Sequence, residues 1–238
     1  MTESTDAGPT TEITRLPEKG RRDRRQLDQL LDEVRIGHFA VLDGGHPVVV
    51  PTAVVRDGDR VLAHGSTGSR WMRSLAAGAP TSLAVTAFDG LVLARSAFES
   101  SMRYRSAVIF GRCAPVSDRR RALDVITDAL IPGRVAELRA PTAKELAATL
   151  VLELPIERWS VKVSAGWPED PESDVAGPAW AGVVPVGLIY LPPRPAPDLR
   201  AGIALPESVR RLSPDGTAAR RPAGQPDEPP DPANPADR

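Results

Sequence analysis

Between residues 38 and 112 the chain repeats one pattern, a short apolar run closed by a turn that contains glycine or aspartate. HFAVLD and PVVVPTAVV flank Gly44-Gly45, RVLAH follows a DGD turn, and TSLAVTAFD meets LVLARSAF at Gly90. Such runs, separated by residues that adopt positive φ, are typical of antiparallel strands joined by tight turns. A βαβ sheet would need helical crossovers between them. We therefore expect a mainly β domain, an antiparallel barrel with peripheral helices.

Helices are expected around this barrel rather than within it. Residues 22–36 show a helical stripe that ends before Gly37, formed by Leu27, Leu30, Leu31 and Val34. A short helix is expected at Trp71, Met72 and Leu75, and a longer one follows Ser117, the expected N-cap. TAKE at 142–145 has the capping-box pattern, so Thr142 is expected to begin another short helix.

Composition divides the chain into three parts. Residues 1–20 are polar without apolar periodicity, and residues 194–238 are rich in proline, so both are expected to be disordered. The folded domain is expected to span residues 21–193.

Charge and cysteine content exclude several classes of function. The net charge is −1, from 30 Lys and Arg against 31 Asp and Glu, which gives no reason to expect nucleic acid or an anionic membrane as a partner. Cys113 is the single cysteine and lies in an apolar run, which fits a packed side chain in a reducing compartment. One cysteine and three histidines are too few for a zinc site, and no apolar stretch approaches membrane-spanning length. We expect a cytoplasmic protein without a metal site.

One strand-to-helix junction, HGSTGSRW at residues 64–71, is rich in hydrogen-bond donors. Its two glycines permit a tight turn with exposed N–H groups, and its hydroxyls and guanidinium add donors suited to a phosphate. The junction is neither a P-loop nor a Gly-x-Gly-x-x-Gly fingerprint. A serine-rich turn with an N-cap explains it equally well, and a lone histidine such as His64 is more often a hydrogen-bonded core residue.

Two further clusters stand out. In RSAFESSMRYRSAVIFG, residues 95–111, serines and arginines interrupt two strands whose pattern otherwise predicts burial in the core. A bound polar ligand would give them partners, but an exposed loop tip would also satisfy them. In residues 159–186, tryptophans and a proline-rich acidic loop follow Lys162, and Trp180 either stacks on a ring system or fills a core gap.

Together these clusters resemble the pyridoxamine 5′-phosphate oxidase-like family of FMN-binding split barrels, and more closely its bacterial flavin-nucleotide-binding and nitroimidazole-reductase-like branch. HGSTGSR, DGLVLARSAF, YRSAVIFG, PGR and WAGVVP follow the family's order between about Arg24 and Leu191. The resemblance implies a six-stranded antiparallel split β-barrel. It also implies a homodimer with two FMN molecules in clefts between the subunits.

The resemblance also implies which residues bind the cofactor. In such proteins the strand-to-helix turn holds the FMN phosphate, the strand before it lies beside the isoalloxazine, and further residues close the cleft from one subunit or its partner. Carried onto this chain, the cofactor-binding residues are Pro51, Thr52, Ala53, His64, Ser66, Thr67, Ser69, Arg70, Arg105, Ser106, Lys162 and Trp180.

This chain departs from the family pattern at one motif. Where relatives read His-His-Ser-Met-Asn-Tyr-Arg-Ser, it reads Glu99-Ser100-Ser101-Met102-Arg103-Tyr104-Arg105-Ser106, and Ser164 replaces an arginine. Some split-barrel relatives bind haem through histidine. Because these histidines are replaced here, the sequence gives less support to haem as a cofactor. The replacements also leave substrate class and activity open.

The leading hypothesis is an FMN-dependent oxidoreductase that acts on a small molecule by hydride or electron transfer through the flavin N5. No residue is identified as catalytic. The alternatives are a non-catalytic flavin binder or sensor, and a relative that uses haem or another phosphorylated cofactor such as the deazaflavin F420 or pyridoxal phosphate.

Overall fold

The structure is a computed structural model that describes residues 9–212 and 219–220. Its main sheet is antiparallel and ten-stranded, in the order β1-β9-β6-β5-β2-β3-β4-β8-β7, with β10 paired to β5. The strands are β1 (Gly20–Arg21), β2 (Ile36–Asp43), β3 (His46–Asp57), β4 (Arg60–Ser66), β5 (Pro80–Leu93), β6 (Ser101–Arg112), β7 (Ala114–Pro115), β8 (Thr149–Pro155), β9 (Arg158–Ser164) and β10 (Gly182–Pro185). A separate pair joins β11 (Leu188–Ile189) to β12 (Ala219–Arg220).

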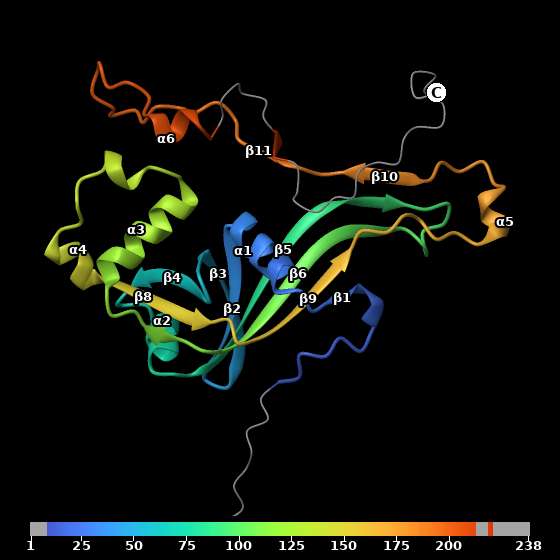
Figure 1. The fold of residues 1–238 in the computed structure, drawn as a ribbon, viewed down its shortest axis with the longest axis horizontal. Helices are drawn as coiled ribbons and strands as arrows, with labels where there is room; N and C mark the ends of the chain where they lie inside the picture. Colours follow the sequence, from blue (N-terminus) through green and yellow to red (C-terminus); the bar gives the residue numbers. More distant parts are fainter. Residues whose placement is uncertain (1–8, 213–218, 221–238) are drawn as a thin grey trace, which may run out of the picture.

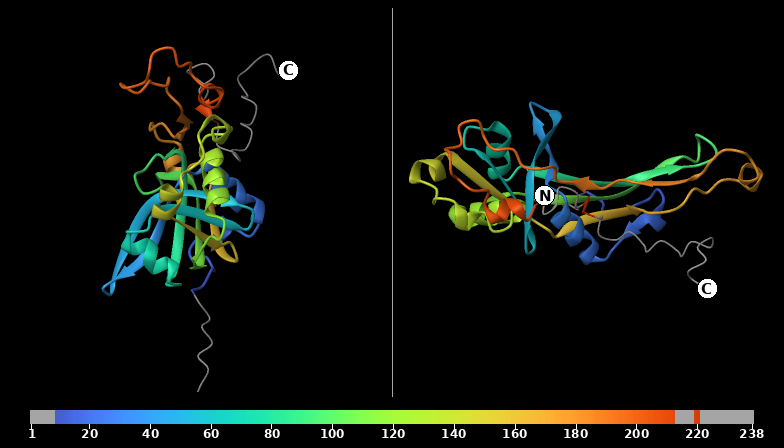
Figure 2. Two further views of the ribbon diagram at one scale, coloured as in Figure 1. Left: turned by 90° about the vertical axis from the view of Figure 1, so that its left-hand side faces the viewer. Right: turned by 90° about the horizontal axis from the view of Figure 1, so that it is seen from above.

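This architecture confirms the mainly β prediction and corrects the strand count. The sheet has ten strands instead of six and is not closed. Figure 1 shows β5 and β6 leaving the body as a long curved ribbon, and Figure 2 shows the same ribbon from above. The four extra strands beyond the expected six include pieces of two residues, which have too few positions for a period-2 pattern.

The helices lie at the periphery, as expected. They are α1 (Arg24–Glu33), α2 (Arg70–Ala76), α3 (Arg119–Leu130), α4 (Ala143–Ala148), α5 (Glu172–Val175) and α6 (Glu207–Arg210), with 3-10 turns η1 (Pro17–Lys19) and η2 (Val135–Glu137). The stripe of α1 packs on the main core, where Leu27, Leu30 and Leu31 are buried. A second core lies under α3, where Ala122 and Ile126 meet Val55, Leu62 and Val151.

Local signals predicted some helix ends and missed others. The Thr142–Glu145 capping box is present, and the hairpin turn has positive φ at Gly44 (60°) and Gly45 (83°). The expected N-cap Ser117 is wrong: Asp118 caps α3, and its carboxylate accepts a hydrogen bond from the N–H of Arg121. Helix α1 is also shorter than the expected 22–36, because Asp23 caps its first turn.

The two segments expected to be disordered contain regular structure where they are described. Gly20 and Arg21 pair with Lys162 and Val161 as β1, directly after η1. In the C-terminal segment α6 docks on η2, where the N–H of Ser208 donates to Glu137 at 3.1 Å. Residues 1–8, 213–218 and 221–238 lie outside the described residues. Within the described part of the chain, no helix is both long enough and apolar enough to span a membrane.

Candidate functional site

The sheet divides next to two of the predicted site residues. Strands β3 and β4 pair only from Val54↔Ala63 to Asp57↔Arg60. Beyond that point β3 continues with β2, where Ala53 pairs with Ile36, while β4 continues with β8, where His64 pairs with Val151. Ala53 and His64 therefore lie at the point where the two halves of the sheet separate.

The 64–70 turn begins on the β8 side of this division. Ser66 ends β4, and its Oγ accepts a hydrogen bond from the N–H of Gly68 at 3.1 Å. Thr67 is bound to the carbonyl of Ala148 through both its N–H and its hydroxyl. Ser69 is the N-cap residue of α2, but its side chain makes no capping bond. The hydroxyls of Ser66 and Ser69 therefore still have a proton to donate, whereas the amides of Gly68 and Thr67 are already bonded within the protein.

His64 lies at the start of this turn and is half-buried. Its Nδ1 is buried and has no hydrogen-bond partner among the described residues. A buried ring nitrogen without a partner costs free energy unless a proton donor, a water or a ligand satisfies it. His64 is thus not the hydrogen-bonded core histidine that is the common case.

Arg70 extends from the turn toward the β2–β3 hairpin. Its Nη2 donates to Asp43 at 2.7 Å, and its side chain is 79% exposed. A groove of about 350 Å³ lies beneath this pair, lined by Val41, Leu42, Asp43, Val48, Val50, Arg70, Trp71 and Ser74. The Trp71 ring lies 5.9 Å from that of Phe39 and ties α2 to the core.

Four of the predicted residues share the outer face of the sheet. Along β3, Val50 and Val54 pack on the main core, so alternation points Pro51 and Ala53 outward and Thr52 inward. Ser106 on β6 pairs with Lys162 on β9, and both alternate with buried neighbours. The described chain thus brings Pro51, Ala53, Ser106 and Lys162 to one face.

Arg105 lies on the opposite, core-facing side and is held by two carboxylates. Its Nε and Nη2 donate to Asp89 at 2.8 and 2.7 Å, and its Nη1 and Nη2 donate to Glu33 at 2.7 and 2.8 Å. Hydrogen bonding to Asp89 is the main cause that raises the pKa of Arg105, against the opposing effect of burial. The guanidinium joins α1 to β5 and β6, and the structure does not bring it to the 64–70 turn.

Lys162 and Trp180 also lie apart from the turn within one chain. The Lys162 Nζ donates to the carbonyl of Arg15 at 3.2 Å. Trp180 precedes β10 and is 66% exposed, and its ring lies over Gly182, where a Cβ would come within 2.7 Å of the indole. Trp180 therefore does not fill a core gap.

The motif that departs from the family pattern spans the end of the loop between β5 and β6 and the first residues of β6. The Oγ of Ser100 accepts from the N–H of Ala94 and donates to the carbonyl of Ser96, and the Oγ of Ser96 accepts from the N–H of Glu99. These serines are therefore satisfied by the loop itself. Arg103 is buried, donates to the carbonyl of Gly166 and lies 5.0 Å from the centre of the Trp167 ring.

Sequence reasoning missed the residues that form the groove beside Arg70. Asp43 is its ion-pair partner, and Trp71 and Ser74 form the wall on α2. Asp43 is the last residue before the Gly44-Gly45 turn. Nothing in the sequence indicates that it pairs with Arg70, which lies 27 residues later.

Comparison with known proteins identifies the family. Residues 23–163 match the family model described as pyridoxamine 5′-phosphate oxidase. An FAD and haem binding protein from Mycobacterium smegmatis is 52% identical, with 82% of this chain and 97% of that one covered and a TM-score of 0.80. The flavocytochrome Anf3 from Azotobacter vinelandii is 37% identical, with 85% and 95% covered and a TM-score of 0.80.

A more distant structure shares the fold alone. It is a candidate 5-nitroimidazole antibiotic resistance protein from Bacteroides thetaiotaomicron, 19% identical over 60% of this chain and 86% of that one, with a TM-score of 0.52. A comparison with curated proteins gave no significant match. The family match and the two similar structures confirm the resemblance seen in the sequence, and the chain belongs to the pyridoxamine 5′-phosphate oxidase-like family with a split β-barrel fold.

Proposed function

We propose that this protein binds a flavin nucleotide and a haem and acts as a flavin-dependent oxidoreductase on a small molecule. The observation that carries the proposal is the 52% identity to a protein described as FAD and haem binding, over 82% of this chain. FAD is proposed ahead of FMN for the same reason. The flavin supplies hydride and electron transfer at its N5.

The 64–70 turn fits the anionic part of a flavin nucleotide. Ser66 and Ser69 each retain a hydroxyl proton to donate, and the Arg70 guanidinium needs only to release one exposed carboxylate to turn toward a phosphate. Exposed ion pairs of this kind stabilise a protein by about 1 kcal/mol or less, so releasing Asp43 costs little. Charge-assisted hydrogen bonds to a phosphate contribute roughly 1.5–3 kcal/mol each, which offsets that cost.

His64 would suit a ligand of the haem iron better than a donor to a phosphate. Imidazole nitrogen is a common iron ligand, and a half-buried histidine is already shielded from competing water. His38 and His46 are exposed on β2 and at the start of β3, and neither has a buried unpartnered nitrogen. The orphaned Nδ1 at the division of the sheet supports His64 among the three histidines.

A homodimer is proposed because the outer face of the sheet leaves large apolar side chains uncovered. Ile36, Val49 and Phe88 on this face are 58, 61 and 44% exposed. Between them lie small residues such as Ala84, which pairs with His38 and Val108. Exposed apolar side chains of this kind are typical of a protein interface, and a second copy would cover them by two-fold symmetry.

The first experiment is the visible spectrum of the purified protein, followed by chromatography and mass spectrometry of the released cofactors. We expect FAD together with haem, with a flavin band and a Soret band. A colourless protein that takes up neither FAD nor FMN would overturn the flavin proposal. Released F420 or pyridoxal phosphate would replace it with another cofactor.

Turnover separates an oxidoreductase from a non-catalytic flavin binder. With NADH or NADPH and an artificial acceptor, we expect repeated reduction and reoxidation of the bound flavin. A flavin that binds stoichiometrically but shows no sustained turnover with either donor would favour the alternative of a carrier or sensor.

The haem assignment has its own test. His64→Gln should remove the Soret band of the haem-loaded protein, whereas His38→Gln should retain it. Equal haem binding by both variants would exclude His64 as a ligand of the haem iron, without bearing on the flavin.

A further inference from the structure

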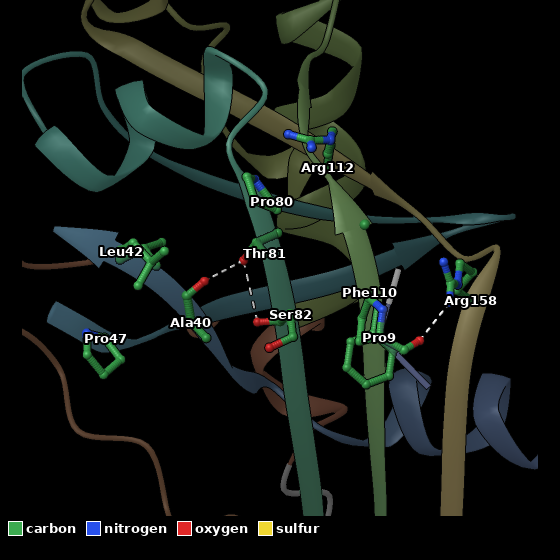
Figure 3. Close-up of a pocket in the computed structure, with 12 residues that line it drawn as sticks. Pro9, Ala40, Leu42, Pro47, Pro80, Thr81, Ser82, Phe110, Arg112 and Arg158 are labelled. Atoms are coloured by element: carbon green, nitrogen blue, oxygen red, sulfur yellow. Dashed lines mark hydrogen bonds between the residues drawn. The ribbon is translucent and has the colours of Figure 1, made fainter. Parts of the chain in front are cut away.

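A second hollow lies on the outer face of the sheet, and it shares Val41 and Leu42 with the groove beside Arg70. It has a volume of about 530 Å³, within the range of sites that hold small molecules. Figure 3 shows Ala40 and Ser82 at its centre, Leu42 and Pro47 on one side, and Phe110 and Pro9 on the other. None of the residues predicted to bind the cofactor lines it.

Strand register explains why the sheet is hollow here. Ala40 pairs with Ser82, Ser82 pairs with Phe110, and Phe110 pairs with Arg158. This cross-strand row thus has two small side chains next to two large ones. Pro80 and Arg112 pair in the next row, and the bulk of Leu42 closes the side toward the hairpin. The result is an apolar floor with raised walls.

The charge of the lining is positive. Arg112 and Arg158 both border the hollow, and no carboxylate belongs to its lining among the described residues. Arg112 donates to the carbonyl of Gly78 and makes no ion pair with the described part of the chain. The Arg158 Nη2 donates to the carbonyl of Pro9 at 2.6 Å and so holds the N-terminal segment in place as a wall (Figure 3).

From this geometry we infer that the hollow binds a flat ring that bears an anionic group. The ring lies over Ala40 and Ser82 against Phe110, where an aromatic edge or face contact is available. The anionic group lies at Arg112, whose planar guanidinium suits a carboxylate or a phosphate. Two sources share this chemistry: a free aromatic acid, and the adenosine phosphate half of a dinucleotide. Only the second source depends on the proposed flavin.

Calorimetric titration of the full-length protein with salicylate tests the site, and salicylamide is the neutral control. We expect saturable binding of salicylate and at least roughly tenfold weaker binding of salicylamide, since a charge-assisted bond is lost. Arg112→Gln should lower the affinity for salicylate by a similar factor, and Arg112→Lys should retain part of that affinity. Arg25→Gln should leave the affinity unchanged. Arg25 is exposed on α1 and its side chain is outside the hollow.

A parent protein that shows no saturable salicylate binding would overturn the inference, as would equal affinities for Arg112→Gln and the parent. Titration in the presence of saturating FAD or FMN then identifies the source. Competition by FAD and not by FMN would assign the hollow to the adenosine half of the cofactor. Salicylate binding unaffected by either flavin would assign it to a separate aromatic acid. Because salicylate binding needs no flavin, this test can succeed even if the flavin proposal fails.

Discussion

At the scale of single residues, the partners of each arginine decide what its guanidinium can do. Arg70 has one exposed carboxylate partner, whereas Arg105 has two partners and is nearly enclosed, with a side chain 11% exposed. The first arrangement leaves donors for a ligand, and the second commits every nitrogen of the guanidinium to the fold. The two residues were predicted for the same site but differ in this respect.

Arg70→Ala should weaken flavin binding by roughly ten- to a hundredfold, because one charge-assisted contact to the phosphate is lost. Fluorescence titration with FAD and FMN measures this. Arg73→Ala is the matched control, since Arg73 is exposed on the same helix and does not line the groove. Equal affinities for Arg70→Ala and the parent would remove Arg70 from the site.

Arg105→Met should destabilise the protein by roughly 3–5 kcal/mol, because it leaves the buried Asp89 carboxylate without its main partner. Urea unfolding at neutral pH measures the loss. Arg139→Met breaks an exposed pair with Glu145 and should cost much less. If the two variants lose similar amounts, the buried network does not stabilise the fold as we describe.

At the scale of elements, turns and caps were predictable because their signals are local. The Gly44-Gly45 turn and the Thr142–Glu145 capping box can each be recognised from four residues or fewer, and both are present in the structure. Ser117 and Asp118 are adjacent and both are good N-caps, so the choice between them depends on the path of the chain after β7. The strands β1 and β10 exist only through partners far away in the sequence, which no local pattern shows.

The α4 cap should weaken in acid. Hydrogen bonding from Arg139, followed by that from the Thr142 N–H, lowers the pKa of Glu145 from 4.5 to about 2. Because the folded-state pKa is depressed, this stabilisation is present above pH 4.5 and is lost as the pH falls toward 2. The protection factors of the α4 amides, which correct hydrogen exchange for its intrinsic pH dependence, should therefore fall across that range in the parent, and Glu145→Gln should remove this fall. Parallel pH profiles for the two proteins would contradict it.

The start of β2 should not accept a side chain at Gly37. A Cβ there would lie 2.6 Å from Leu83 Cδ1 and 2.9 Å from Val54 Cγ1, both within the main core. Gly37→Ala should destabilise the protein by roughly 1–3 kcal/mol through overpacking. Gly45→Ala meets no atoms within 4 Å, so in urea unfolding any cost there comes only from its positive φ. No loss of stability in Gly37→Ala would show that Leu83 and Val54 can move aside.

At the scale of the whole molecule, the outer face of the sheet should mediate dimer formation. Ala84→Arg places a charge in the middle of that face and should shift the protein from dimer to monomer in size-exclusion chromatography with light scattering. Ala147→Arg, at an exposed position of α4, should leave the protein dimeric. A parent protein that is monomeric, or an Ala84→Arg variant that remains dimeric, would rule out this interface.

The family and the general fold could be predicted from the sequence, whereas the arrangement of the site could be predicted only in part. The order of short motifs identified the family. The position of Arg105 could not be foreseen, because its partners Asp89 and Glu33 lie 16 and 72 residues away. Any contribution of Lys162 and Trp180 to a cleft between subunits stays a prediction.

The docking of α6 has a practical consequence for truncation. Composition suggests that the chain could be shortened after residue 193 without harm. That cut would remove Ser208, which is 2% exposed and hydrogen-bonded to Glu137 of η2. A truncated protein would expose the surface of η2 that α6 now protects. An expression boundary chosen for the proline content alone would discard part of the folded body.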